Sequence, residues 1–153
     1  MIYNKNGAII SHCQNYRYQL WRIWNDDLHK VMFIMLNPST ADENEDDATI
    51  RKCIRYAKKW NYGGIYVGNL YAYRAKDRSV IKKVSNPIGE DLSKHLNEMA
   101  LKCDKIVCAW GNKEGRSERV FSVFKDLHCL KLNIDGTPAH PLYLDGDLKP
   151  VKL

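Results

Sequence analysis

VMFIML, residues 31–36, is a continuously apolar run that stops at Asn37-Pro38. A short run of this kind is typical of a strand that other elements cover on both faces. Proline has no backbone N–H and cannot continue a central strand, so we expect the strand to end here. Pro38 also restricts Asn37 to an extended backbone. The sequence therefore predicts a buried strand with an Asn side chain held at its carboxyl end.

Strands and helices alternate on either side of this run. Residues 48–60 carry apolar side chains at helical spacing after Asp46-Asp47, and an Asp at the N-cap favours a helix start. Residues 16–24 alternate apolar and polar, which suits a half-buried strand at one edge of the sheet. Three further strands are expected at 65–69, 105–110 and 128–133, and two further helices at 89–102 and 117–126. This order predicts a three-layer α/β/α fold, with a mostly parallel four-stranded central sheet and an added N-terminal edge strand.

The chain is expected to form a single domain over residues 1–153, because this length suits one core and no repeat or linker divides it. It has no apolar run long enough for a membrane span and no signal-peptide pattern at its start, so a cytoplasmic location without membrane contact is expected. The five cysteines are scattered and lack a C-x-x-C pair, and we interpret them as reduced thiols.

Charge gives two open hypotheses. The formal net charge of +6 favours polyanionic partners such as nucleic acid, although solvated helix faces give a similar excess of Lys and Arg. The acidic residues 42–47 can be interpreted as ligands of a divalent cation or as a solvated loop that ends in a helix cap. We favour the cap and expect neither a metal nor another cofactor.

Polar side chains follow each of the expected inner strands. Asn37 and Asn69 follow two of them, Trp110-Gly111 a third, and His140-Pro141 comes after the fourth and a glycine-containing turn. Ligands of parallel sheets bind beyond the carboxyl ends of the strands, so we expect Asn37, Asn69 and His140 to line one pocket. Strand-end Asn residues are also common as turn or cap residues, and His140 can equally brace the last loop.

The ordered motifs RYQLWRIW, FIMLNPSTADENEDDATIRKC, GNLYAYRA, AWG and PAHPLYL resemble those of a bacterial and phage family known as a domain of unknown function. The resemblance covers nearly the whole chain. More distantly, the same order resembles the uracil-DNA glycosylase superfamily. That superfamily carries Asp-Pro or Asn-Pro after its first core strand, Asn after the second, Trp-Gly after a later strand, and His-Pro near the C-terminus followed by a Leu that enters the DNA stack.

The more distant resemblance implies a uracil-DNA glycosylase-like domain that flips a modified or damaged base out of DNA and hydrolyses its N-glycosidic bond. Asn37 would place the attacking water, Asn69 would bind the edge of the base, and His140 would stabilise charge that develops on the base. Leu144 would be the wedge that fills the gap in the stack. Further ligand contacts are expected from Pro38, Ser39, Tyr71, Trp110 and Gly111.

A binding module is the alternative function. Asn37 can orient a water but cannot act as a carboxylate base, and the acidic residues 42–47 suit a DNA backbone poorly. The chain can therefore be a non-catalytic module for a nucleotide or a nucleoside-derived small molecule, since a fold does not fix a function. The expected partner is DNA in the first case and a small molecule in the second. Neither requires a protein partner.

Overall fold

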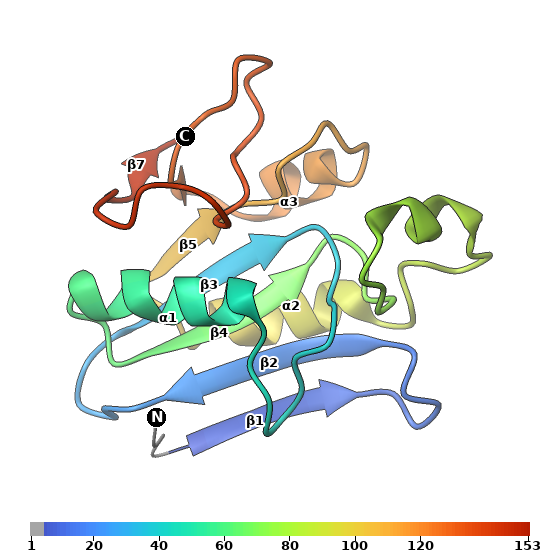
Figure 1. Ribbon diagram of the computed structural model, residues 1–153, viewed down its shortest axis with the longest axis horizontal. Helices are drawn as coiled ribbons and strands as arrows, with labels where there is room; N and C mark the ends of the chain where they lie inside the picture. Colours follow the sequence, from blue (N-terminus) through green and yellow to red (C-terminus); the bar gives the residue numbers. More distant parts are fainter. Residues whose placement is uncertain (1–4) are drawn as a thin grey trace.

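A computed structural model describes residues 5–153 of the chain. Its centre is a seven-stranded sheet in the order β1-β2-β4-β3-β5-β6-β7 (Figure 1). The strands are β1 Lys5–Ile10, β2 Arg17–Ile23, β3 Lys30–Met35, β4 Gly64–Asn69, β5 Lys105–Cys108, β6 Leu127–Cys129 and β7 Val151–Lys152. The helices are α1 Ala48–Lys59, the 3₁₀ helix η1 Arg78–Lys83, α2 Leu92–Ala100 and α3 Ser117–Val123.

The middle of the sheet is parallel and its edges are antiparallel. β3 pairs in parallel with β4 and β5, and β5 pairs in parallel with β6. β1 pairs with β2, β2 with β4, and β6 with β7 in antiparallel fashion. The four strands expected in parallel are therefore present, but the sheet is wider than the sequence predicted.

The prediction that residues 16–24 form an edge strand is wrong. β2 lies between β1 and β4, and β1 is the edge. The sequence of β1, KNGAII, has little alternation and contains a glycine, so its periodicity does not reveal a strand. β7 has only two residues and carries no pattern of its own. Both strands form because they complete the hydrogen bonds of a neighbouring strand.

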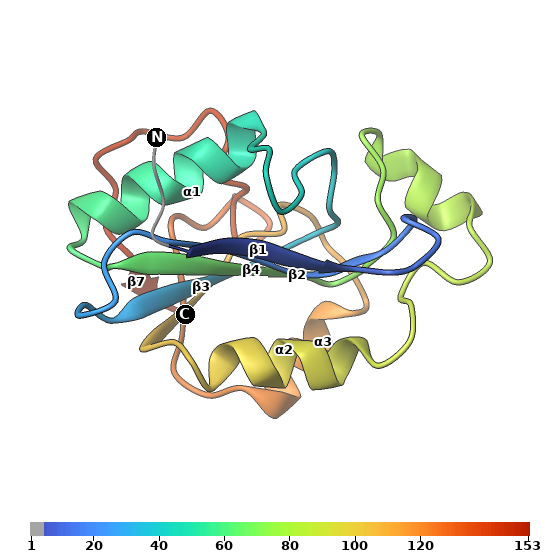
Figure 2. The same cartoon turned by 90° about the horizontal axis from the view of Figure 1, so that it is seen from below.

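Helices cover both faces of the sheet (Figure 2). α1 lies on one face, where Ile54 packs in one core cluster with Phe33 and Val67. α2 lies on the other face with α3, and there Leu96 shares a core cluster with Met32. β3 is buried on both sides, as its apolar run predicted, because alternate side chains enter the two clusters.

The predicted helices are confirmed, with shorter ends. α1 begins at Ala48 after its N-cap Asp47, whose Oδ1 accepts a hydrogen bond from the Ile50 backbone N–H at 2.9 Å, and it ends before Trp60. α2 and α3 end two to three residues before the predicted limits of 102 and 126. The final strand, expected over 128–133, is reduced to β6 because the chain turns away after Cys129.

A bulge in β2 changes which face its first residue occupies. Ile9 pairs with Gln19 and Ile10 with Arg17, so Tyr18 has no opposite residue on β1. Tyr18 and Gln19 then both face α2, where the Tyr18 ring stacks on His95 and the Gln19 amide lies 2.9 Å from the His95 Nδ1. Consequently Arg17 faces α1, on the same side of the sheet as Leu20.

No helix within residues 5–153 is both long enough and apolar enough to cross a lipid bilayer.

Candidate functional site

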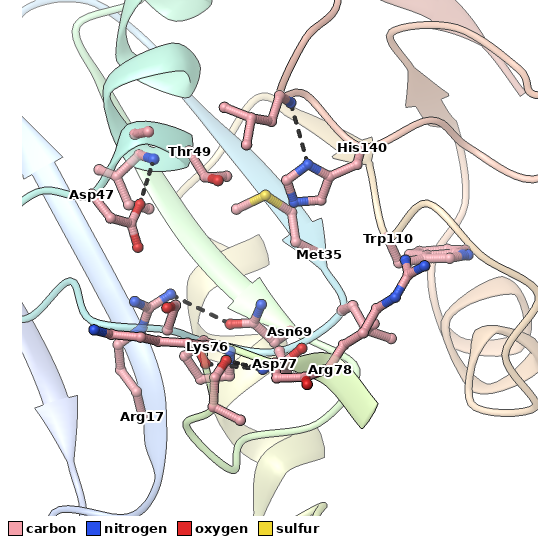
Figure 3. Close-up of a pocket in the computed structure, with 18 of the residues that line it drawn as sticks. Arg17, Met35, Asp47, Thr49, Asn69, Lys76, Asp77, Arg78, Trp110 and His140 are labelled. Carbon is pink, nitrogen blue, oxygen red and sulfur yellow. Dashed lines mark hydrogen bonds between the residues drawn. The ribbon is translucent and has the colours of Figure 1, made fainter. Parts of the chain in front are cut away.

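A cavity of about 720 Å³ lies beyond the carboxyl ends of the inner strands, a volume typical of small-molecule sites. The ends of β3 and β4 form its floor, and the first turn of α1 forms one wall. Residues 75–78 form a second side of the cavity, and His140, Leu142 and Tyr143 form a third (Figure 3). Six of the residues singled out from the sequence line this cavity: Asn37, Pro38, Ser39, Asn69, Trp110 and His140.

Asn37 is held by two backbone carbonyls. Its Nδ2 donates to Ala75 O at 2.9 Å and to Pro38 O at 3.0 Å. These bonds attach the end of β3 to the segment before η1 and fix the rotation of the amide. The Oδ1 is then the atom of this side chain that can accept a hydrogen bond from a water or ligand.

Asn69 ends β4 and is only 2% exposed. Its Oδ1 accepts from the Arg17 Nη2 at 3.5 Å, and its Nδ2 has no hydrogen-bond partner among the residues that the structure describes. A buried amide donor without a partner is unusual and costs about 1–3 kcal/mol. The Asn69 side chain therefore offers a donor to any acceptor that enters the cavity.

Arg17 lies beside Asn69 and is 3% exposed. Its Nη1 donates to Ala41 O at 3.2 Å, while its Nε has no partner within residues 5–153. Burial lowers the pKa of the guanidinium to about 10, and the more distant Asp47 carboxylate opposes this effect. The guanidinium keeps its charge at neutral pH, in a position that water hardly reaches.

His140 presents a defined tautomer to the cavity. Its Nδ1 lies 3.2 Å from the Leu142 backbone nitrogen, which can only donate, so Nδ1 must be the unprotonated acceptor. Burial lowers the pKa of His140, the Arg78 charge lowers it further, and Asp47 has the opposite effect. The imidazole is therefore neutral at pH 7 with its proton on Nε2. Figure 3 shows that nitrogen turned away from the Leu142 bond and toward the space between the labelled side chains.

Gly111 supports His140 from behind. It has φ +86°, and a Cβ at this position would meet the His140 Cβ at 3.2 Å. Its N–H donates to Pro138 O at 2.8 Å, and its carbonyl accepts from the Asn133 Nδ2. Gly111 thus helps to place the last loop, although it was expected to contact the ligand and does not line the cavity. Trp110 does line it, and its ring lies against Phe121.

Two residues singled out from the sequence lie elsewhere. Tyr71 lines a neighbouring cavity of about 560 Å³, where its hydroxyl donates to the Glu114 carboxylate at 3.1 Å. Leu144, the expected wedge, is half-buried and packs against the core cluster under α1. Its neighbour Tyr143, which was not predicted to contact a ligand, is 94% exposed at φ 71° on the cavity rim.

The sequence did not identify Arg17 as a site residue. Its alternating context indicated an edge strand, and only the bulge at Tyr18 directs its side chain into the cavity. Asp47 was recognised only as a helix cap. Lys76, Asp77 and Arg78 belong to a long loop, and loop length was the one signal that could have pointed to them.

The acidic residues 42–47 act as a structural loop. Arg22 is fully buried, and its Nε lies 2.8 Å from the Asp46 carboxylate. Its Nη2 donates to Asp42 O and to Glu45 O. The Asp42 side chain accepts from the Asn44 and Glu45 N–H groups, which lowers its pKa. Within residues 5–153 no three His, Cys, Asp or Glu side chains are grouped so that they could hold a metal ion.

Comparison with known proteins identifies the family. Residues 17–142 match the model of a family described as "Protein of unknown function (DUF1643)". Searches of the curated proteins and of the solved structures give no match. The matched range contains every cavity residue except Tyr143, from Arg17 on β2 to Leu142. Because the match covers most of its length, the chain belongs to the DUF1643 family.

Proposed function

We propose that this chain binds a nucleobase in the cavity at the strand ends and hydrolyses the N-glycosidic bond that joins it to the sugar. The observation that supports this most directly is His140, a neutral imidazole whose Nε2–H is available to the cavity. A donor in this position can stabilise negative charge that develops on a base as the bond breaks. A neutral imidazole suits this role, because it can donate a hydrogen bond to the departing base without transferring its proton to it.

The neighbouring side chains support the same proposal. The Asn69 Nδ2 can donate to an acceptor on the base edge. The Asn37 amide is oriented by its bonds to Pro38 O and Ala75 O, so that Oδ1 can position a water. An amide is no general base, and we therefore expect slow hydrolysis.

The topology of the parallel strands supports a ligand site at the end of β3. The four parallel strands follow the order β4-β3-β5-β6, so β3, the first of them in sequence, lies inside the sheet. β4, the next parallel strand in sequence, lies on one side of β3, and β5 lies on the other. The strand order therefore reverses at β3, and ligands of such sheets bind beyond the strand ends at this reversal. Asn37 follows β3 directly at this point.

A base-release assay tests the proposal. Duplex and single-stranded DNA, each with one modified base from a panel, are incubated with the wild type, and free base is measured by mass spectrometry. His140→Ala should slow release by about a hundredfold or more while retaining DNA binding. Asn69→Ala should lose both base selection and rate. His29→Ala is the control, because His29 is exposed and does not line the cavity.

Binding without hydrolysis is the second candidate function. The Asp47 and Asp77 carboxylates line the cavity and would repel the continuous phosphate backbone of a DNA strand, whereas a single nucleotide or nucleoside derivative can enter with its charged group directed to the basic side chains Arg17, Lys76 and Arg78. In that case both variants should lose affinity for a mononucleotide, and the wild type should release no base from any substrate. If both variants keep wild-type affinity and turnover, Asn69 and His140 are structural residues and both candidate functions are wrong.

A further inference from the structure

Arg17 brings a buried positive charge to the cavity, and no described residue supplies a counter-ion in contact with it. Arg17 is 3% exposed, and its guanidinium makes two hydrogen bonds, at 3.2 and 3.5 Å, to the oxygens of Ala41 and Asn69. No Asp or Glu among the described residues forms an ion pair with it. The Nε donor has no partner within the same residues.

A second arginine of the same strand shows what a structural buried guanidinium looks like here. Arg22 is also fully buried, but it forms an ion pair with Asp46 and donates to several backbone carbonyls. Charges inside proteins are normally compensated in this way, because an unpaired buried ion is strongly unfavourable. Arg17 departs from that pattern, because it lines the cavity and has no ion pair among the described residues.

Asp47 does not supply the missing partner. Its Oδ1 accepts the Ile50 N–H as the cap of α1, and it affects Arg17 only through longer-range attraction. Asp47 therefore attracts Arg17 without forming an ion pair with it, and its carboxylate already serves as the cap of α1.

Several other polar groups of the cavity are donors, although the Asp77 carboxylate lines it as well. The Asn69 Nδ2 is unpartnered among the described residues, and the Asn69 side chain is nine-tenths or more buried. Lys76 and Arg78 line the same cavity, and the His140 Nε2–H is available to it. A set of donors with a buried guanidinium at its base matches a ligand that brings both acceptor oxygens and negative charge.

We propose that the Arg17–Asn69 pair receives an oxyanion of the ligand, a phosphate or a carboxylate, and that this group is the counter-ion of Arg17. The inference rests on the proposed function, because it assigns the charged group of a nucleotide-type ligand to the same cavity. Phosphate would come from the nucleotide itself. Carboxylate would come from a substituted base. Both bring the same chemistry to the floor of the cavity.

The first test compares three substitutions by thermal melting in a chloride buffer without oxyanions. Arg17→Met removes an uncompensated charge, so the free protein should melt at the wild-type temperature or higher. Arg22→Met removes a charge that has its partner and should melt far lower. Arg55→Met, at an exposed position on α1, controls for the change in net charge. An Arg17→Met variant that melts clearly below the wild type, or does not fold, overturns the proposal.

The second test measures binding to pairs of compounds that differ in one anionic group. The pairs are each deoxynucleoside 5′-monophosphate with its nucleoside, and 5-carboxyuracil with uracil. In at least one of these pairs the charged compound should bind the wild type at least tenfold more tightly than the uncharged one. Arg17→Met should abolish that difference in affinity, while Arg55→Met keeps it. Tighter binding of a monophosphate than of its nucleoside identifies phosphate as the oxyanion, and tighter binding of 5-carboxyuracil than of uracil identifies carboxylate. If neither charged compound gains, or if the gain survives in Arg17→Met, the proposal is wrong.

The outcome can be separated from that of the proposed function. In one outcome, base release depends on His140, but Arg17→Met binds charged and uncharged compounds as the wild type does. That outcome would support the proposed function and contradict the oxyanion site. Oxyanion binding that depends on Arg17, without base release from any DNA, would support the oxyanion site and leave a binding module as the function.

Discussion

His140 is held neutral by its surroundings, and this should be visible in the pH dependence of stability. Burial, as the main cause, lowers its pKa below the ordinary value. The unfolded chain then takes up a proton at a higher pH than the folded protein does. The contribution of His140 to the free energy of unfolding is therefore complete above about pH 6.5, the ordinary His pKa. It decreases as the pH falls below this value toward the pKa of the folded protein.

His140→Gln should remove this contribution. We expect the free energy of unfolding of the wild type, relative to that of the variant, to decrease steadily from pH 7.5 to pH 5.5 in urea denaturation. His95 also has a pKa lowered mainly by burial, but it is present in both proteins and cancels in the comparison. Parallel stability curves would show that His140 is not the titrating group.

The two strand-end asparagines should respond in opposite ways to a change to aspartate. Asn69→Asp places a carboxylate next to the Arg17 guanidinium and should stabilise the free protein by about 1–2 kcal/mol. Asn37→Asp replaces a donor that binds Ala75 O and Pro38 O, and should destabilise it by about 1–3 kcal/mol.

Urea denaturation of the two variants at pH 7 measures both effects. Asn69→Asp should in addition weaken the binding of anionic ligands, because it supplies a counter-ion from within the protein. Equal destabilisation by both substitutions would contradict this description of the two amides.

The turn after β5 depends on Gly111, which has a positive φ, and Gly136 provides a matched comparison. Both glycines have φ near +85°, and a Cβ at Gly136 meets nothing within 4 Å. Gly111→Ala and Gly136→Ala should each cost about 1–2 kcal/mol of stability, because both force an L-residue into the left-handed region. Only Gly111→Ala also brings a Cβ against His140.

NMR titration of the His140 ring distinguishes the two alanine variants. Its pKa and chemical shifts should change in Gly111→Ala and stay as in the wild type in Gly136→Ala. Ligand affinity should follow the same pattern. A His140 signal that is unchanged in Gly111→Ala would show that the last loop is placed independently of this glycine.

The positive charge of the whole molecule predicts where a nucleic acid would lie. The net charge is +6, and the exposed Lys82 and Lys83 of η1 stand on the segment that borders the cavity. If DNA is the partner, the double variant Lys82→Glu/Lys83→Glu should reduce affinity for a single-stranded oligonucleotide at least tenfold and weaken its salt dependence.

The control for this prediction makes the same change in charge elsewhere. Arg55→Glu/Lys94→Glu alters exposed residues on α1 and α2 that do not line the cavity. Fluorescence anisotropy at two or more salt concentrations compares the two variants. Equal losses of affinity would indicate a diffuse attraction to DNA without a defined path past the cavity.

The sequence was sufficient to predict the elements that carry their own periodicity. The apolar run ending at Pro38 forms β3, and the helical spacing after Asp47 forms α1, with the cap where the side chain chemistry predicts it. The strand ends could be located as well, since Asn37, Asn69 and His140 all reach one cavity. Their chemical roles stay predictions. The tip of the last loop was less predictable, because packing against α1 retains Leu144 and leaves Tyr143 exposed.

What the sequence determined about this protein is thus the parallel centre of the sheet, its covering helices and the polar residues at its carboxyl ends, because all of these follow from local patterns of side chains. Only the tertiary structure decided the face on which Arg17 lies. Strict alternation from Leu20 and Arg22 would place Tyr18 toward α1 and Arg17 toward α2. The bulge opposite Ile9 and Ile10 reverses this. Its position depends on the pairing of β1 with β2, a contact between segments that no local pattern encodes.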